Sequence, residues 1–186
     1  MPIIGSLAGV SSRGLGGLRT FGAAVVNSFE SIQTVNVTSG VSSIAFTSIP
    51  ATYKNLQIRY SLTAAAPADT GLRFNSDSGA NYSNSLFRGT GSAAQIYPYS
   101  AINQAYVQYN IGYNTSVAVI DILDYTNTNK NTSIRSLAGF DNITTGEIDF
   151  WGGGWYNTAA VTRIDLHCLS STFSANSKFA LYGIKG

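Results

Sequence analysis

Hydrophobic and polar residues alternate along many short stretches of this chain. Residues 56–63 alternate strictly, so that Arg59 faces solvent and the opposite face carries Leu56, Ile58, Tyr60 and Leu62. Further stretches with strand character are residues 32–38, 41–47, 71–75, 84–88, 117–125, 133–140, 146–151, 161–169 and 178–184. Polar turn clusters at 75–79, 126–131 and 170–177 lie between them. The pattern predicts an all-β fold, an antiparallel β-sandwich or jelly-roll-like domain over residues 29–186.

Residues 117–125 differ from the other stretches because both of their faces are apolar. Val117, Val119 and Leu123 would share one face, and the other face would carry Ala118, Ile120 and Ile122. An antiparallel strand with one face open to water does not normally carry two apolar sets. We therefore expect this strand either to be central and covered on both sides, or to present one face to a subunit interface.

The first 28 residues follow neither a strand period nor a helix period. Six glycines interrupt a run of small and apolar residues, and the charged side chains before Glu30 are Arg13 and Arg19. A segment that is both Gly-rich and apolar indicates an extended arm that becomes ordered against a partner. The alternative is an N-terminal strand that folds onto its own domain. The candidate anchoring residues of the arm are Ile3, Ile4, Leu7, Arg13, Leu15, Leu18, Arg19 and Phe21.

Residues 95–113 form a tyrosine-rich segment without charge. Tyrosine offers contact area with a polar tip and loses little rotamer freedom on binding, which suits protein interfaces and sugar faces. A further hairpin packed on its own sheet is the alternative. The candidate interface or receptor residues are Tyr97, Tyr99, Tyr106, Tyr109 and Tyr113.

Composition and charge narrow the class of protein. Charged residues make up 11% of the chain and the net charge is +2, too small to predict a nucleic-acid partner. Cys168 is the only cysteine, so no disulfide can form within the chain. No signal-peptide pattern is visible, and no stretch reaches the roughly 20 apolar residues of a membrane helix. We therefore expect synthesis in a cytoplasm and no membrane insertion.

The residue types that carry catalysis are scarce. His167 is the only histidine, and on a strand it would share one face with Asp165 and Arg163 while Cys168 points into the core. A Cys–His pair at adjacent strand positions fails on geometry, and no Gly-x-Ser-x-Gly motif supports a serine nucleophile. One histidine and one cysteine do not make a zinc site. Residues 75–79 indicate an Asx-rich turn, not a calcium loop, since no acidic residue follows at the bidentate position. We expect no enzyme activity, no metal and no cofactor.

Several strings together resemble a family of small virion-associated proteins of tailed phages, frequent in aquatic and cyanobacterial phages. The resemblance spans nearly the whole chain and is carried by the start MPIIGS, by FTSIPATYKNL at 46–56, by RFNSD at 73–77, by WYNTAAVT at 155–162 and by LYGI at 181–184. It implies a particle component without enzymatic activity, in head decoration or in tail-fibre and attachment modules. The string at 48–53 is expected to form a strand–turn–strand corner in which Pro50 fixes the turn.

The leading hypothesis is a capsid decoration (cement) protein, a homotrimer on the virion surface that assembles in the host bacterial cytoplasm. It would bind the major capsid protein through its arm. Head decoration is preferred to a fibre because the chain has no coiled-coil, collagen-like or β-helix repeat that would build a shaft. The alternative is a short tail fibre or tail-associated attachment module. Its arm would bind a tail or baseplate protein, and its tyrosines would bind a host-surface glycan.

Overall fold

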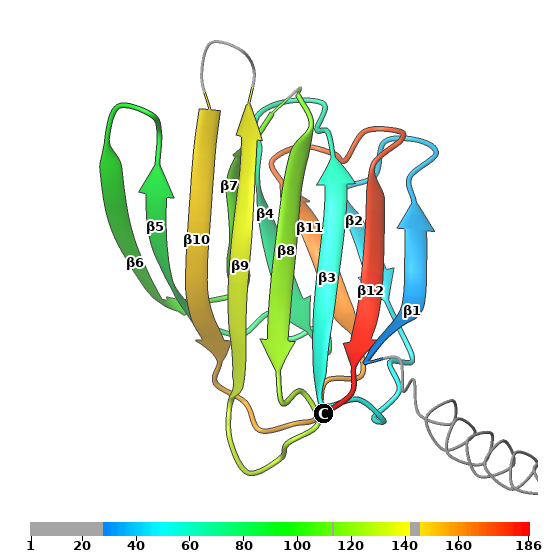
Figure 1. The fold of residues 1–186 in the computed structure, drawn as a ribbon. Helices are drawn as coiled ribbons and strands as arrows, with labels where there is room; N and C mark the ends of the chain where they lie inside the picture. The colour runs from blue at the N-terminus through cyan, green and yellow to red at the C-terminus, as the bar shows by residue number, and fades with distance from the viewer. Residues whose placement is uncertain (1–27, 113, 142–145) are drawn as a thin grey trace, which may run out of the picture.

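The computed structural model describes residues 28–112, 114–141 and 146–186, which form two antiparallel β-sheets packed face to face (Figure 1). No helix occurs among these residues. The all-β antiparallel sandwich predicted from the alternation is therefore confirmed. Apart from Ser28, the predicted arm lies outside the described residues.

The larger sheet has eight strands. In spatial order they are β1 (Phe29–Asn36), β12 (Lys178–Ile184), β3 (Asn55–Leu62), β8 (Ser116–Leu123), β9 (Thr132–Asp141), β10 (Gly146–Trp155), β5 (Tyr82–Gly89) and β6 (Ala94–Ile102). Every neighbouring pair is antiparallel. The sheet is open, so β1 and β6 are its two edge strands.

The smaller sheet has four strands, in the order β2 (Ser43–Phe46), β11 (Ile164–Leu169), β4 (Ala68–Phe74) and β7 (Ala105–Ile111). It lies behind one side and the centre of the larger sheet, so that β5 and β6 extend past its edge strand β7 (Figure 1). The tyrosine-rich segment supplies both β6 and β7. These strands pair with β5 and β4 in different sheets, so the hairpin considered for this segment does not form.

The core lies between the two sheets and follows the predicted alternation. Leu56, Ile58, Tyr60 and Leu62 of β3 are at most 4% exposed, and they meet Phe46, Leu72, Phe74, Ile164 and Leu166 from the smaller sheet. Burial of one such side chain stabilises the fold by about 1.5–3 kcal/mol. Cys168 is also buried on the inner face, as its strand position predicts.

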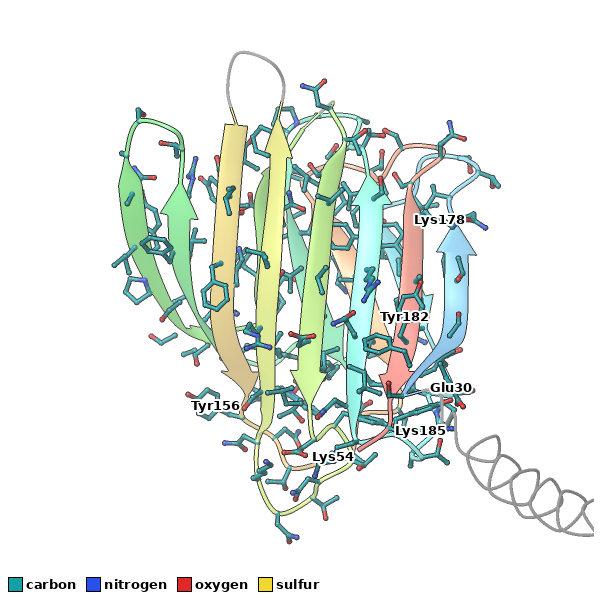
Figure 2. The ribbon with its side chains drawn as sticks, viewed as in Figure 1. Glu30, Lys54, Tyr156, Lys178, Tyr182 and Lys185 are labelled. Carbon is teal, nitrogen blue, oxygen red and sulfur yellow. The ribbon has the colours of Figure 1, made fainter. Side chains whose placement is uncertain are left out.

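The predicted corner at 48–53 carries the chain from β2 in the smaller sheet to β3 in the larger one. The Tyr125 hydroxyl donates a hydrogen bond to the Pro50 carbonyl. The Tyr53 ring packs so closely on Gly183 that a Cβ there would lie 2.3 Å from it. The Tyr53 hydroxyl donates to Glu30, which also pairs with Lys185. The start of β1, the corner and the C-terminal residues therefore meet at one end of the sandwich, where Figure 2 labels Glu30 and Lys185.

Candidate interaction surface

The outer face of the larger sheet carries large apolar side chains. Strand register aligns Val119, Leu137, Phe150, Phe87 and Ile96 in one row across β8, β9, β10, β5 and β6. Val117 and Ile148 lie one step along in the next row, on either side of Gly139. We call these seven residues the apolar patch. Because the strands pair without interruption, the patch is continuous over five strands.

The patch is open to solvent in the described chain. Its seven side chains are 38–72% exposed, with Val119 the least and Ile96 the most exposed. At these values they present an apolar area on the order of 600 Å², the upper end of the ~300–600 Å² found for the largest patch on a typical monomer. Apolar patches at the upper end of this range are often binding surfaces.

Strand β8 carries the two apolar sets predicted for it. Ala118, Ile120 and Ile122 are buried in the core, whereas Val117 and Val119 belong to the patch. The strand is central in its sheet, with β3 and β9 on either side. Its second face is not covered by the described chain. Within the described residues the strand is therefore central but not covered on both faces, and the subunit interface stays a prediction.

On the outer face of the larger sheet, the described charged side chains lie at the border of the patch and not within it. Asp121 and Arg135 form a salt bridge of 2.8 Å in the next row. On β3, the Arg59 guanidinium sits over the rings of Phe29 and Tyr182, 5.3 and 5.4 Å from their centroids. Tyr182 lies on the face of β12 seen in Figure 2. An uncharged centre with a polar border is the usual arrangement of a protein–protein interface.

The outer face of the smaller sheet has the opposite character. It presents Asp165, His167 and Arg73, which follow from the register of β11 with β4. Asp165 accepts hydrogen bonds from the Arg163 guanidinium at 2.6–2.9 Å and not from His167. Burial, followed by the Arg73 charge, lowers the pKa of His167. The two outer faces of the sandwich therefore differ, and large apolar side chains gather on only one of them.

The candidate tyrosines do not form one surface. Tyr99 and Tyr106 pack with Trp151 beneath the part of the larger sheet that extends past β7, with ring centroids 5.2–5.7 Å apart. Tyr109 lies under the Arg88 guanidinium, which is 4.4 Å from its centroid. Tyr97 on edge strand β6 is 39% exposed. Tyr113 lies outside the described residues.

The arm residues also lie outside the described part of the chain, namely Ile3, Ile4, Leu7, Arg13, Leu15, Leu18, Arg19 and Phe21. The structure does place the point where the arm joins the domain. The carbonyl of Ser28 accepts a hydrogen bond from the amide of Lys185 at 3.0 Å. The arm therefore leaves the domain at the edge strand β1, beside the C-terminal residues.

Buried polar side chains of the larger sheet bind the free edge of β7. Asn84 bonds to the backbone of Tyr106 through both its oxygen and its nitrogen. The Ser136 hydroxyl donates to the Val107 carbonyl at 2.6 Å, and Asp149 accepts from the Tyr109 amide at 2.7 Å. Backbone groups at a sheet edge need such partners when they are buried. Asp149 thus has a structural function.

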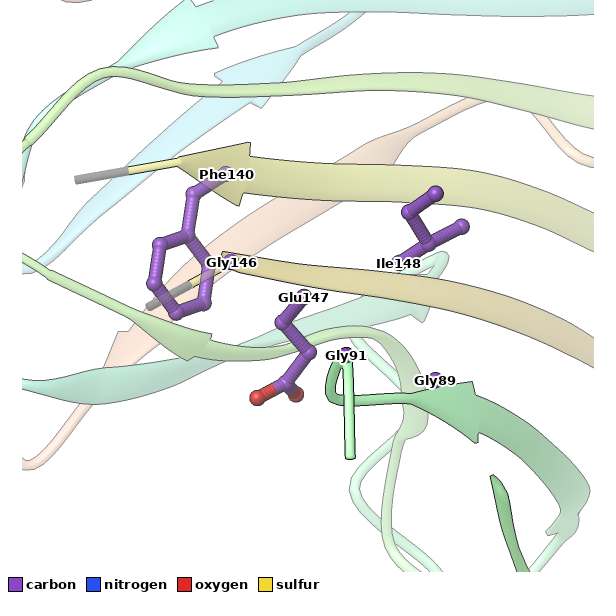
Figure 3. Close-up of a pocket in the computed structure, with 6 residues that line it drawn as sticks. All are labelled: Gly89, Gly91, Phe140, Gly146, Glu147 and Ile148. Carbon is purple, nitrogen blue, oxygen red and sulfur yellow. The ribbon is translucent and has the colours of Figure 1, made fainter. Parts of the chain in front are cut away.

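Glu147 lies two residues before Asp149 on the same inner face of β10. Its carboxylate pairs with Arg88 at 2.6 Å. Burial raises the pKa of both carboxyl groups, and their mutual repulsion adds to the rise at Glu147. Glu147 also borders a hollow of about 450 Å³ at the end of the sheet, together with Phe140, Ile148 and three glycines (Figure 3). The hollow adjoins residues 142–145, which the structure does not describe, so we assign no site to it.

No metal site is evident in the described ranges, where no group of three or more His, Cys, Asp or Glu side chains is placed to hold an ion. In the turn at 75–79, the carboxylate of Asp77 is occupied by hydrogen bonds within the protein. Asp77 accepts hydrogen bonds from the Trp155 indole at 2.7 Å, from the Gly79 amide and from Asn81. The Asx-rich turn predicted there is therefore present, with its carboxylate used to fix Trp155.

Sequence reasoning found the β8 part of the patch and missed the rest. Phe87, Leu137 and Phe150 each follow or precede an apolar residue that is buried, namely Leu86, Ala138 and Trp151. Adjacent apolar residues in a strand must point to opposite faces. That signal was available in the sequence for three strands besides β8.

Within the parts of the chain that are described, no helix has the length and hydrophobicity needed to cross a lipid bilayer. No protein-family model matches the chain, and no curated protein matches it.

Proposed function

We propose that this chain is a non-enzymatic structural protein on the surface of a tailed-phage virion, where it decorates the head. The observation that carries the proposal is the apolar patch on the outer face of the larger sheet. A patch at the upper end of the range found on monomers is often a binding surface, and a subunit of an assembly would cover it. The resemblance of the sequence to virion-associated proteins of tailed phages supports a phage particle as that assembly.

The polar groups inside the sandwich support a structural function. Asn84, Ser136 and Asp149 bind the edge of β7, and Asp77 fixes Trp155. Asp165 pairs with Arg163, and Cys168 is buried, where burial raises its pKa to about 11. A thiol with this pKa is a poor nucleophile at neutral pH. Each of these groups has a structural explanation that requires no substrate.

The arm is the proposed anchor to the particle. It joins the domain at β1, at the opposite edge of the sheet from β6, so the arm and the apolar patch can bind different partners. Ordering each arm residue costs about 1–2 kcal/mol, which burial of its Ile, Leu and Phe side chains against a capsid protein would offset. The described residues form one buried apolar cluster between the two sheets.

The test is to delete residues 1–21 and to compare particle incorporation and thermal unfolding with the full chain. We expect a folded domain that no longer joins virions of the phage that encodes it. A double variant with Ser11→Ala and Ser12→Ala serves as the control, because it changes the arm outside its candidate anchoring residues and should join virions normally. Unfolding of the truncated chain would mean that the arm belongs to its own core. Normal incorporation would place the anchor elsewhere.

A second candidate is the tail-associated attachment module. It is favoured by a hollow of about 240 Å³ at the end of β4 and β7, lined by Asp69, Tyr109, Asn110 and Ser170 among others. A carboxylate, an amide and an aromatic ring in one concave site are groups that bind sugar hydroxyls and sugar faces. Virions that carry Asp69→Ala should then lose adsorption to host cells but keep the protein, whereas unchanged adsorption would remove this candidate.

A further inference from the structure

The patch is the strongest unassigned feature of the molecule, and its occupant can be inferred from its geometry. Its central row runs straight across five hydrogen-bonded strands, with Phe150 in the middle between Leu137 and Phe87. A sheet face of this kind packs against another sheet, with side chains interdigitating at a separation of about 10 Å. The occupant should therefore offer a flat apolar face of similar width.

The area of the patch can be compared with the area that a stable contact requires. A standard protein–protein interface buries about 800 Å² on each partner. The patch side chains supply on the order of 600 Å² of apolar area, and their polar border adds to it. The patch with its border is thus wide enough for one complete interface.

Charge excludes a strongly charged occupant. Asp121 and Arg135 in the next row neutralise each other. The guanidinium of Arg59, at the β3 end of the central row, lies over the rings of Phe29 and Tyr182. Burying an unpaired charge against the patch would cost several kcal/mol. A surface with the same uncharged apolar centre would meet no such cost.

The described surface holds only one such face. The remaining exposed large hydrophobic residues are Phe29, Tyr97, Leu123 and Tyr156, which are dispersed, and the outer face of the smaller sheet is polar. An apolar contact between the described surfaces of two copies therefore places patch against patch. A contact in which both copies use the same surface has twofold symmetry.

We propose that the apolar patch is the contact surface of a homodimer, in which two copies stack the outer faces of their larger sheets around a twofold axis near Phe150. The inference deepens the proposed function, since it names the partner that covers the surface on which that function rests. The twofold contact differs from the homotrimer expected from the sequence.

The experiment measures the mass of the purified full-length protein by light scattering and by sedimentation. We expect twice the chain mass of 19.7 kDa. Phe150→Glu should produce a monomer, because it places two carboxylates at the axis. Ser133→Glu is the matched control, since Ser133 lies on the same outer face of β9, two rows away, and the variant should remain a dimer.

A mixing experiment tests the symmetry. Phe150→Lys should also be monomeric, and mixing it with Phe150→Glu should restore a dimer that contains one copy of each. Circular dichroism confirms that both variants are folded. If either is unfolded, Leu137→Glu and Leu137→Lys replace the pair, since Leu137 is the neighbour of Phe150 in the row. Two folded variants that do not associate would overturn patch-against-patch packing.

Other results also decide against the proposal. A trimer, or a dimer that persists in Phe150→Glu, would place the contact elsewhere. A monomeric full chain that dimerises when residues 1–21 are deleted would assign the patch to the arm. A monomer in which Phe150→Glu abolishes virion incorporation would assign it to another virion protein. Particle incorporation of the truncated chain is measured separately, so failure of the dimer leaves the virion proposal standing.

Discussion

The side-chain amide of Asn84 on β5 takes the place of a strand partner for Tyr106 on β7. Its oxygen accepts from the Tyr106 amide at 3.1 Å, and its nitrogen donates to the Tyr106 carbonyl at 3.3 Å. One side chain of the larger sheet thus forms hydrogen bonds with both the amide and the carbonyl of Tyr106, at the edge of the smaller sheet. The two layers are joined by directional contacts as well as by apolar packing.

Asn84→Ala should destabilise the domain by about 2 kcal/mol, because two partly buried backbone groups lose their partners. Urea unfolding followed by tryptophan fluorescence measures the loss. Ser85→Ala, at the next and exposed position of β5, should change the free energy of unfolding by less than about 0.5 kcal/mol. Equal effects of the two substitutions would show that the amide does not bind the edge of β7 in solution.

The pH dependence of stability should reflect Glu147. Burial raises its pKa to about 7 in the folded chain, above its ordinary value of 4.5. The folded state then binds more protons than the unfolded state between these values, so the contribution of Glu147 to stability falls as the pH rises from about 4.5 to 7. Glu147→Gln should remove this contribution. The free-energy difference between variant and wild type should therefore shift in favour of the variant from pH 5 to pH 8.

Glu30→Gln provides the control for this measurement. Hydrogen bonds from Lys185 and Tyr53 lower the pKa of Glu30. Its contribution is therefore lost only as the pH falls below the ordinary value of 4.5, and the unfolding curves of Glu30→Gln and wild type should run parallel above about pH 5.5. Parallel curves for Glu147→Gln as well would contradict the raised pKa of Glu147.

Cys168 should react with iodoacetamide only when the domain unfolds. The thiol is 5% exposed, and burial raises its pKa to about 11, so little thiolate is present at pH 8. Mass spectrometry of the alkylated protein in buffer and in denaturant measures the difference. Rapid alkylation of the native protein would mean that β11 opens or that the thiol faces solvent.

His167→Ala should leave both the fold and particle incorporation unchanged. The imidazole lies on the polar outer face of the smaller sheet, and Asp165 is engaged by Arg163 instead. Circular dichroism and virion incorporation provide the readouts. A hydrolytic activity of the wild type that disappears in this variant, with the fold retained, would reverse the assignment as a non-enzymatic protein.

The sequence predicts most of the strands because their apolar residues recur at every second position and so lie on one face. Residues 56–63 are an example, since β3 buries one set of side chains and exposes Arg59. The sheet assignment of residues 95–113 could not be predicted in this way. Strands β6 and β7 follow each other closely in the chain, but β6 is an edge strand of the larger sheet and β7 is an edge strand of the smaller sheet.

The inner and outer faces of β10 reverse the usual relation between polarity and burial. Glu147 and Asp149 point inward, while Ile148 and Phe150 point outward. A pattern based on hydrophobicity alone would exchange these faces. The reversal has two physical causes: Arg88 and the Tyr109 amide bind the acids inside, and the apolar pair belongs to the patch outside. The first cause depends on tertiary contacts that residue order does not reveal, whereas the adjacent Phe150 and Trp151 already indicate apolar side chains on both faces.

Quantitative mass spectrometry of purified virions tests the central claim most directly. The peptide ratio of this chain to the major capsid protein gives its copy number per particle. We predict a ratio of the same order as one, as for a protein that covers the head. A ratio corresponding to a few or a few dozen copies would move the protein to the tail. Its absence from purified virions would contradict the proposed function.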